Sequence, residues 1–141
     1  MKLSQVREVK NLSNELDIDF KELVENVNEQ NNDFEIGNYR FIASDEIDKI
    51  QQDELKSDLY ILGCFNDWFI ADNTNLSLKV VQALQKAEAF EELGELMVDE
   101  IETIQSEYSR LDGYGNHFAH YDGDEWEINL NGVNYYYFRV N

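Results

Sequence analysis

The stretch "EWEINLNGVNYYYFRV", residues 125–140, decides the predicted fold of the C-terminal region. Two segments rich in aromatic and β-branched residues flank Asn131-Gly132, a dipeptide that favours the two-residue turn of a β-hairpin. Such a turn fixes the register of both strands, because it sets which residues stand opposite each other. The predicted pairs are Leu130 with Val133, Ile128 with Tyr135, and Trp126 with Tyr137, all on one side of the sheet.

The residues before this hairpin, "NHFAHY" at 116–121, also alternate with a period of two, and Asp122-Gly123 offers a second tight turn. We therefore expect a three-stranded antiparallel meander, with the Trp126 side packed on a long helix. The opposite side is predicted to carry carboxylates and aromatic rings, covered by the N-terminal elements or available to a partner. Its residues are Glu125, Glu127, Tyr136 and Phe138.

The rest of the chain is predicted to be helical apart from one short hairpin, which makes the fold class α+β. Apolar residues at helical spacing, with Asp19 as an N-cap, predict a helical pair over residues 1–31. The segment 32–44 then predicts a hairpin around Gly37-Asn38, and Ser44 is expected to cap an acidic helix that ends near Leu55. The N-terminal helical pair could be semi-independent, within a single domain over residues 1–141.

Two further helices are predicted between residues 58 and 111. The run "DLYILGCFNDWFIAD", residues 58–72, is apolar nearly all round, which is typical of a helix buried at the centre of a domain, with Cys64 as a small buried residue. Ser77 is expected to cap a long helix whose apolar seam continues to Leu111. A second copy of the chain could also bury this seam, so a homodimer is one possible state.

The composition bounds the class of protein. The chain has 30 acidic and 11 basic residues and a formal charge of −19, a balance that repels phosphates and attracts basic partners. One cysteine cannot form an internal disulfide, and the N-terminal residues lack the apolar core of a signal peptide. No hydrophobic stretch is long enough to span a membrane. We therefore expect a cytoplasmic protein, in the host cytoplasm if a phage encodes it, that binds neither membranes nor nucleic acid directly.

The only two histidines, His117 and His120, lie close to Asp122 and raise the alternative of a hydrolase or a metal protein. Residues three apart on a strand point to opposite faces, so these imidazoles could not share one ion without a bulge. Asp122-Gly123 is already explained by a hairpin turn. The sequence therefore predicts no catalytic residue, no metal site and no cofactor.

Two segments, Leu12–Val27 and Ile70–Gln85, align without gaps and are apolar at their first, seventh and twelfth positions, with a capping residue at the eighth. This spacing resembles the helix–turn–helix of bacterial repressors. The resemblance gives the turn positions to Asp17 and Asn75, the cap to Ser77 and the buried position to Val81. It implies a transcriptional regulator whose DNA-contacting residues would be Lys79, Gln82 and Lys86. Phosphate contacts supply most DNA affinity, and the acidic surroundings of both segments oppose them.

An acidic face is predicted on the long helix, because residues 87–109 contain no Lys or Arg and their carboxylates recur at a spacing of four and three. These residues are Glu88, Glu92, Glu95, Asp99 and Glu102. A solvated helix usually interleaves Lys with Glu, and this one accepts like-charge repulsion instead. A row of fixed negative charges can occupy a groove that normally holds nucleic-acid phosphates.

The whole-chain character, small, acidic and aromatic-rich, resembles the inhibitors that phages and mobile elements use against host nucleases and CRISPR effectors, some of which mimic DNA. Acidic immunity proteins that neutralise nuclease toxins share this character. The resemblance implies a non-enzymatic inhibitor that binds a basic nucleic-acid-binding protein through the acidic face. Glu125, Glu127 and Tyr136 are expected to add to this surface.

Overall fold

The computed structural model describes residues 1–141 and confirms the α+β class. Its elements alternate between helices and short hairpins along the chain. They are α1 (Leu3–Leu16), α2 (Phe20–Asn28), β1 (Asp33–Ile36), β2 (Tyr39–Ala43), α3 (Ile47–Lys56), α4 (Leu59–Gly63), α5 (Asp67–Asn73), α6 (Leu78–Lys86), α7 (Phe90–Met97), the 3-10 turn η1 (Val98–Glu100), α8 (Ile101–Asp112), α9 (Gly115–Phe118), β3 (Trp126–Leu130) and β4 (Val133–Arg139). No helix is long and apolar enough to cross a membrane.

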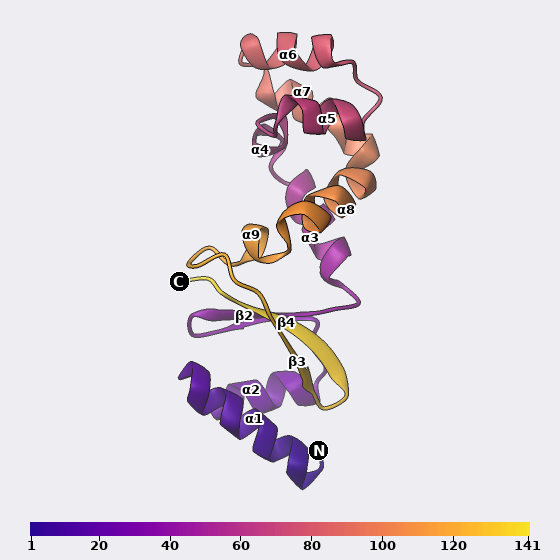
Figure 1. The fold of residues 1–141 in the computed structure, drawn as a ribbon. Helices are drawn as coiled ribbons and strands as arrows, with labels where there is room; N and C mark the ends of the chain where they lie inside the picture. The colour runs from indigo at the N-terminus through magenta and orange to yellow at the C-terminus, as the bar shows by residue number, and fades with distance from the viewer. The chain divides into compact units, whose positions relative to one another are not determined.

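The chain divides into two compact units. The first comprises Met1–Ile47 and Asp112–Asn141, and it contains the sheet with α1, α2 and α9 (Figure 1). The second comprises Asp48–Leu111 and is entirely helical. Each unit has a hydrophobic core of its own. The helical pair of residues 1–31 belongs to the first unit, and the single folding domain over residues 1–141 stays a prediction.

The sheet of the first unit has four antiparallel strands in the order β1-β2-β4-β3. The predicted β3–β4 hairpin is confirmed with its register, which pairs Leu130 with Val133, Ile128 with Tyr135 and Trp126 with Tyr137. Asn131 and Gly132 have φ angles of 53° and 81°. Two positive φ angles in succession define the turn type that matches the twist of the strands, so this dipeptide sets the register. The β1–β2 hairpin is confirmed as well, with Gly37 at φ 58°.

The predicted first strand of the meander is wrong. Residues 116–121 contain the end of the short helix α9 and a turn instead of a strand beside β3, and β4 has β2 as its second neighbour. Gly115 explains the difference, since a Cβ at this position would lie 2.9 Å from the carbonyl carbon of Gly123. The chain therefore folds back on itself here through contact between two backbones, which hydrophobic periodicity does not report.

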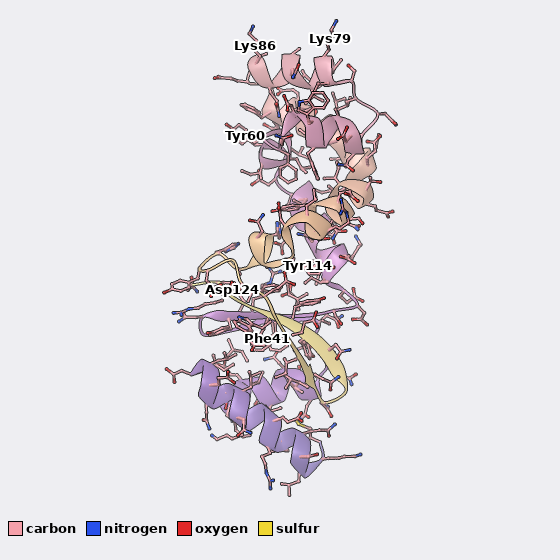
Figure 2. The ribbon with its side chains drawn as sticks, in the orientation of Figure 1. Phe41, Tyr60, Lys79, Lys86, Tyr114 and Asp124 are labelled. Carbon is pink, nitrogen blue, oxygen red and sulfur yellow. The ribbon has the colours of Figure 1, made fainter.

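The partner of the sheet also differs from the prediction. The face that carries Tyr135 packs on α1 and α2 of the N-terminal pair, and the long predicted helix takes no part in this core. Phe41 lies at its centre, with its ring stacked at 5.1 Å from that of Phe34 (Figure 2). Val9, Leu23 and Val27 of the two helices are fully buried against this face.

On the opposite face of the sheet, Phe138 is fully buried rather than free for a partner. Its ring lies 5.2 Å from that of Phe118 in α9. The guanidinium of Arg40 lies 5.1 Å from the centre of the Phe118 ring and also forms an ion pair with Asp33. The cover on this face therefore comes from residues just before β3 and not from the N-terminal elements.

The predicted central helix over residues 58–72 is wrong. The segment forms two short helices, α4 and α5, separated at Cys64, Phe65 and Asn66. Asp58 and Asn66 each accept a hydrogen bond from the backbone three residues on, so the sequence supplies two N-caps. Only Leu62, Gly63 and Ile70 are buried, and Cys64 is exposed instead of buried. The two short helices bury different faces, so the whole run is apolar although neither helix is buried on all sides.

The predicted long helix from Ser77 to Leu111 is divided as well. The cap at Ser77 is confirmed, but α6 ends at Lys86 and a second helical stretch, α7–η1–α8, begins at Phe90. Glu88 lies between them with a left-handed φ of 57°, and the Ala89 N–H bonds back to the Leu84 carbonyl. This is the hydrogen bonding of a Schellman ending, which usually carries glycine. The predicted acidic helix after Ser44 begins later, at Ile47.

Candidate functional site

Four carboxylates of the predicted acidic face lie exposed on the continuous stretch α7–η1–α8. They are Glu92, Glu95, Asp99 and Glu102, and we call this set the acidic helix surface. Residues three or four apart on a helix are neighbours at about 5–6 Å. The set spans about 15 Å along the helix at about 1.5 Å per residue. The buried residues of the same stretch, among them Leu93, Met97 and Ile104, face the core of the second unit.

Glu88 does not belong to this surface, which corrects the prediction. It is exposed, but its left-handed backbone ends α6 and separates it from the helix that carries Glu92. A side chain at such a helix ending does not share the 3.6-residue period of the next helix. The row of carboxylates on one helix is therefore four residues long rather than five.

Two glycines hold α7 tightly against α4. A Cβ on Gly94 would lie 2.7 Å from the carbonyl carbon of Leu59, and one on Gly63 would lie 2.6 Å from that of Phe90. Each glycine thus faces the backbone of the other helix, and the two contacts are reciprocal. Tyr60 adds an edge-to-face contact with the Phe90 ring at 5.3 Å. This packing gives the acidic helix surface a rigid support.

No cation within the protein neutralises the acidic helix surface. Elsewhere on the helices, exposed carboxylates form ion pairs with basic residues three or four positions away, as Asp53 does with Lys49 and Glu107 with Arg110. The hydrogen bond from Arg110 lowers the pKa of Glu107. Residues 87–109 contain no Lys or Arg, so the acidic helix surface has no such partner on its own helix. The surface can release repulsion only by binding a cation from outside.

An exposed leucine lies among these carboxylates, and the sequence reasoning did not single it out. Leu96 is 50% exposed. It follows Glu92 by four residues and precedes Asp99 by three, so it is a neighbour of both on the helix. The sequence could have indicated its exposure, because Leu96 lies off the helix face formed by the buried residues Leu93 and Met97. An apolar side chain ringed by charges is typical of a protein contact.

Of the residues predicted to add to the surface from the sheet, two make contacts within the protein and one is exposed. The Glu125 carboxylate accepts hydrogen bonds from the backbone N–H groups of Tyr114 and Gly115, at 2.8 and 3.1 Å. The Tyr136 ring packs at 5.0 Å from that of Tyr114. Glu125 and Tyr136 thus hold α9 in place, whereas Glu127 is exposed on β3. They belong to the first unit and the acidic helix surface to the second.

The histidine segment has a different geometry from the one we predicted. His117 lies in α9 with its ring edge-on to Phe118 at 4.6 Å, and His120 is exposed in the following turn. The Asp122 carboxylate accepts a hydrogen bond from the Asp124 N–H and so stabilises the turn. Figure 2 labels Asp124 in this loop. The structure brings together no group of three or more His, Cys, Asp or Glu side chains that could hold a metal ion.

Both segments with helix–turn–helix spacing form helix pairs. In the first, Asp17 takes the left-handed conformation and the Asp19 side chain accepts a hydrogen bond from the Glu22 N–H. In the second, Ser77 caps α6 and Val81 is fully buried, as predicted. Asn75 departs from the prediction because its φ is not positive.

The alternative DNA-binding residues lie on the exposed side of α6. Figure 2 shows the side chains of Lys79 and Lys86 extending from the same side of this helix, away from α5 and α7. Gln82 is exposed between them, and its side-chain amide donates a hydrogen bond to the Asp67 carboxylate at 3.1 Å. The two lysines therefore stand in the same unit as the acidic helix surface, which opposes binding to phosphates.

No protein-family model, curated protein or solved structure matches this chain.

Proposed function

We propose that this protein is a non-enzymatic inhibitor that binds a basic nucleic-acid-handling protein, such as a nuclease or a CRISPR effector, through the acidic helix surface. The observation that carries the proposal is that four exposed carboxylates on one rigid helix lack any basic neighbour on that helix. A groove lined by Lys and Arg offers the charges that they lack. The inhibitor would occupy this groove in place of the nucleic acid.

The geometry supports a protein partner over free cations. Leu96 supplies an apolar contact at the centre of the carboxylates, and apolar contacts contribute most where charges surround them and exclude water. The reciprocal glycine packing of α4 and α7 keeps the surface ordered before binding, which reduces the entropy lost on association. The same mode of binding would suit an immunity protein that neutralises a nuclease toxin.

The proposal is tested by charge reversal with a charge-matched control. We expect the variant with Glu92→Lys, Glu95→Lys and Asp99→Lys to lose partner binding by at least about a hundredfold, since close charge pairs across an interface contribute about 1.5–7 kcal/mol. The control carries Glu22→Lys and Glu25→Lys on α2 and Glu29→Lys just after it, which changes the formal charge equally. Partner binding is measured by affinity capture from the native host with quantitative mass spectrometry.

Two further arms decide whether the partner's groove is the one for nucleic acid. Excess duplex DNA or single-stranded RNA should displace the inhibitor from the captured partner, and Leu96→Ala should weaken capture without changing the charge. If the charge-reversed variant captures the same partner as the unaltered chain, the acidic helix surface is irrelevant. Equal loss in the α2 control would show that only net charge matters.

A helix–turn–helix regulator is the second candidate, favoured by the Ser77 cap of α6 and by the exposed lysines of that helix. It predicts that the purified protein retards a random DNA duplex at low salt and that Lys79→Glu with Lys86→Glu abolishes the shift. Absence of a shift for the unaltered protein at 50 mM salt would dispose of this candidate, because non-specific binding is strongest at low salt.

A further inference from the structure

The outer edge of β3 is an open strand edge in the first unit. Leu130 and Val133 close a two-residue turn and form a hydrogen-bonded pair, and such pairs alternate along an antiparallel ladder. The backbone N–H and C=O groups of Glu127 and Asn129 therefore point away from β4. No other backbone group bonds to them. An edge of this kind is a template for a further strand.

A groove follows this edge on the side of the sheet that faces α1. It forms an open cavity of about 470 Å³. The cavity is lined by Glu8, Asn11, Leu12, Glu15, Ile128 and Asn129. Leu12 and Ile128 form its apolar floor, and the carboxylates of Glu8 and Glu15 stand on the helix side. Neither carboxylate forms an ion pair with a basic side chain of the protein.

A second cavity, of about 250 Å³, lies next to the first, since both are lined by Glu15. Its other lining residues are Leu16, Tyr39, Asp122, Trp126, Tyr137 and Arg139. The Tyr137 ring lies 6.5 Å from that of Trp126 and 6.3 Å from that of Tyr39, so three aromatic rings surround this space.

Charge and aromatic rings make this second cavity suited to a cation. Aromatic faces attract ammonium and guanidinium groups, and Glu15 and Asp122 add two carboxylates. The one basic residue there is already engaged, because the Arg139 guanidinium lies 3.9 Å from the Tyr121 ring centre and donates to the backbone oxygen of Asn141. Trp126 is 52% exposed, so its ring is accessible to a ligand.

We propose that β3 accepts an extended basic peptide segment of a partner protein as a fifth strand of the sheet. The peptide backbone pairs with Glu127 and Asn129. Alternate side chains of a strand point to one face, so residues two apart on the peptide both face α1. One basic side chain enters the cavity formed by Tyr39, Trp126 and Tyr137, and the next lies between Glu8 and Glu15. The recognised pattern is therefore a basic residue, any residue, and a second basic residue.

Charge decides between the possible occupants of this edge. A second copy of the chain would bring another Glu8 and Glu15 to the same groove, and each copy carries a formal charge of −19. Like charges placed opposite each other across an interface cost several kcal/mol. A Lys- or Arg-bearing segment instead meets unpaired carboxylates. This inference does not depend on the acidic helix surface, which lies in the other unit.

The first test uses the full-length protein and a synthetic peptide, acetyl-VKVKVKV-amide, whose lysines alternate with valines. We expect saturable binding by calorimetry at low salt, with backbone chemical-shift changes in β3. A peptide of the same sequence with an N-methyl group on every residue keeps its charge but has no backbone N–H to donate to β3. Its affinity should fall by at least about tenfold, the effect of losing about 1.4 kcal/mol of backbone hydrogen bonding.

The second test alters the protein at the edge and in the cavity. Glu127→Pro removes an outward N–H that β4 does not use, and Glu127→Gln removes the same charge but keeps that N–H. We expect the proline variant to bind the peptide at least about tenfold more weakly than the glutamine variant. Trp126→Leu and Glu15→Gln should each reduce affinity, whereas Glu92→Lys on the acidic helix surface should leave it unchanged.

Three results would overturn the proposal. One is equal affinity for the N-methylated and unmodified peptides, which would mean that only charge is recognised. Another is no binding of acetyl-VKVKVKV-amide at low salt. The third is a dimer of the unaltered protein, in sedimentation equilibrium, that Glu127→Pro dissociates, since a second copy would then occupy the edge. Because the partner assays of the acidic helix surface use other residues, failure of either proposal leaves the other measurable.

Discussion

Replacing Gly94 with alanine tests whether close backbone packing of α4 and α7 supports the second unit. The new Cβ would lie 2.7 Å from the carbonyl carbon of Leu59, 2.9 Å from its Cα, and closer still to its carbonyl oxygen. Ordinary carbon contacts begin near 3.5 Å, so the two helices must separate by about 1 Å. The obstacle is backbone, which cannot rotate away as a side chain could.

The expected magnitude follows from two opposing terms. Overpacking of a rigid contact costs typically about 1–3 kcal/mol, and the absence of any flexible neighbour places this site at the upper end. Alanine regains about 1 kcal/mol of helix propensity over glycine. We therefore expect Gly94→Ala to reduce the free energy of unfolding of the second unit by about 2 kcal/mol. Gly63→Ala should cost a similar amount, since its Cβ would meet the backbone of Phe90.

The assay is native-state amide hydrogen exchange of α4 and α7, which reports the opening free energy of each helix. Glu95→Ala on the exposed side of α7 is the matched control, expected within about 0.5 kcal/mol of the unaltered chain. Since both glycines serve one contact, the double variant should lose less than the sum of the single losses. Unchanged exchange in Gly94→Ala would refute the packing argument, because a gain in helix propensity alone would slow exchange.

Three further predictions concern single residues. Glu88→Gly should raise stability by about 0.5 kcal/mol in urea denaturation, because glycine relieves the left-handed strain but adds unfolded-state entropy, whereas Glu88→Ala should not. Glu125→Ala should destabilise the first unit by about 2 kcal/mol through lost charge-assisted bonds to Tyr114 and Gly115, and Glu125→Gln by less. Burial raises the pKa of Tyr137, and the negative charge of Glu15 raises it further. Above a pH of about 10, the folded state therefore keeps a proton that the unfolded chain loses, so the free energy of unfolding falls as pH rises. The urea midpoint is measured at pH 8 and at pH 10.5, and Tyr137→Phe should show a smaller drop between them than the unaltered chain. The exposed-site variant Tyr60→Phe is the control, and an equal drop in the two variants would contradict the prediction.

Features that depend on a few adjacent residues could be predicted from the sequence. Asn131-Gly132 fixed a turn and hence every pair in β3–β4, and the side-chain caps at Asp19 and Ser77 begin the helices expected there. A cap or a tight turn is decided by hydrogen bonds within four residues. These are the interactions that a short stretch of sequence contains in full.

Helix endings without glycine could not be predicted in this way. Asp17, Gln30 and Glu88 all take left-handed φ angles at the ends of α1, α2 and α6. Only Asp17 belongs to a residue type that tolerates this conformation well. At Glu88 the apolar spacing continued through the break, so the acidic face was predicted one residue too long.

Contacts between distant parts of the chain were also beyond the sequence pattern. The pairing of β2 with β4 joins residues about a hundred positions apart, whereas the local strand that we expected at 116–121 does not form. The second cavity beside β3 likewise combines Glu15 from α1 with Trp126 and Tyr137. Hydrophobic periodicity states which face is apolar, and it does not state which element covers that face.

The cost of the acidic helix surface is an argument for its use. The three neighbouring like-charge pairs from Glu92 to Glu102 each destabilise a helix by about 0.2–0.5 kcal/mol, which totals about 1 kcal/mol. Close glycine packing and a separate core offset this loss, so the helix stays formed without internal neutralisation. A cationic partner that binds the surface recovers that energy on association, and by linkage it stabilises the second unit increasingly as the free partner concentration rises above Kd. Because the helix holds these carboxylates close together, their repulsion is relieved only when a basic groove binds, and this relief adds to the binding free energy. On a flexible segment the same charges would move apart before binding, and no such contribution would remain.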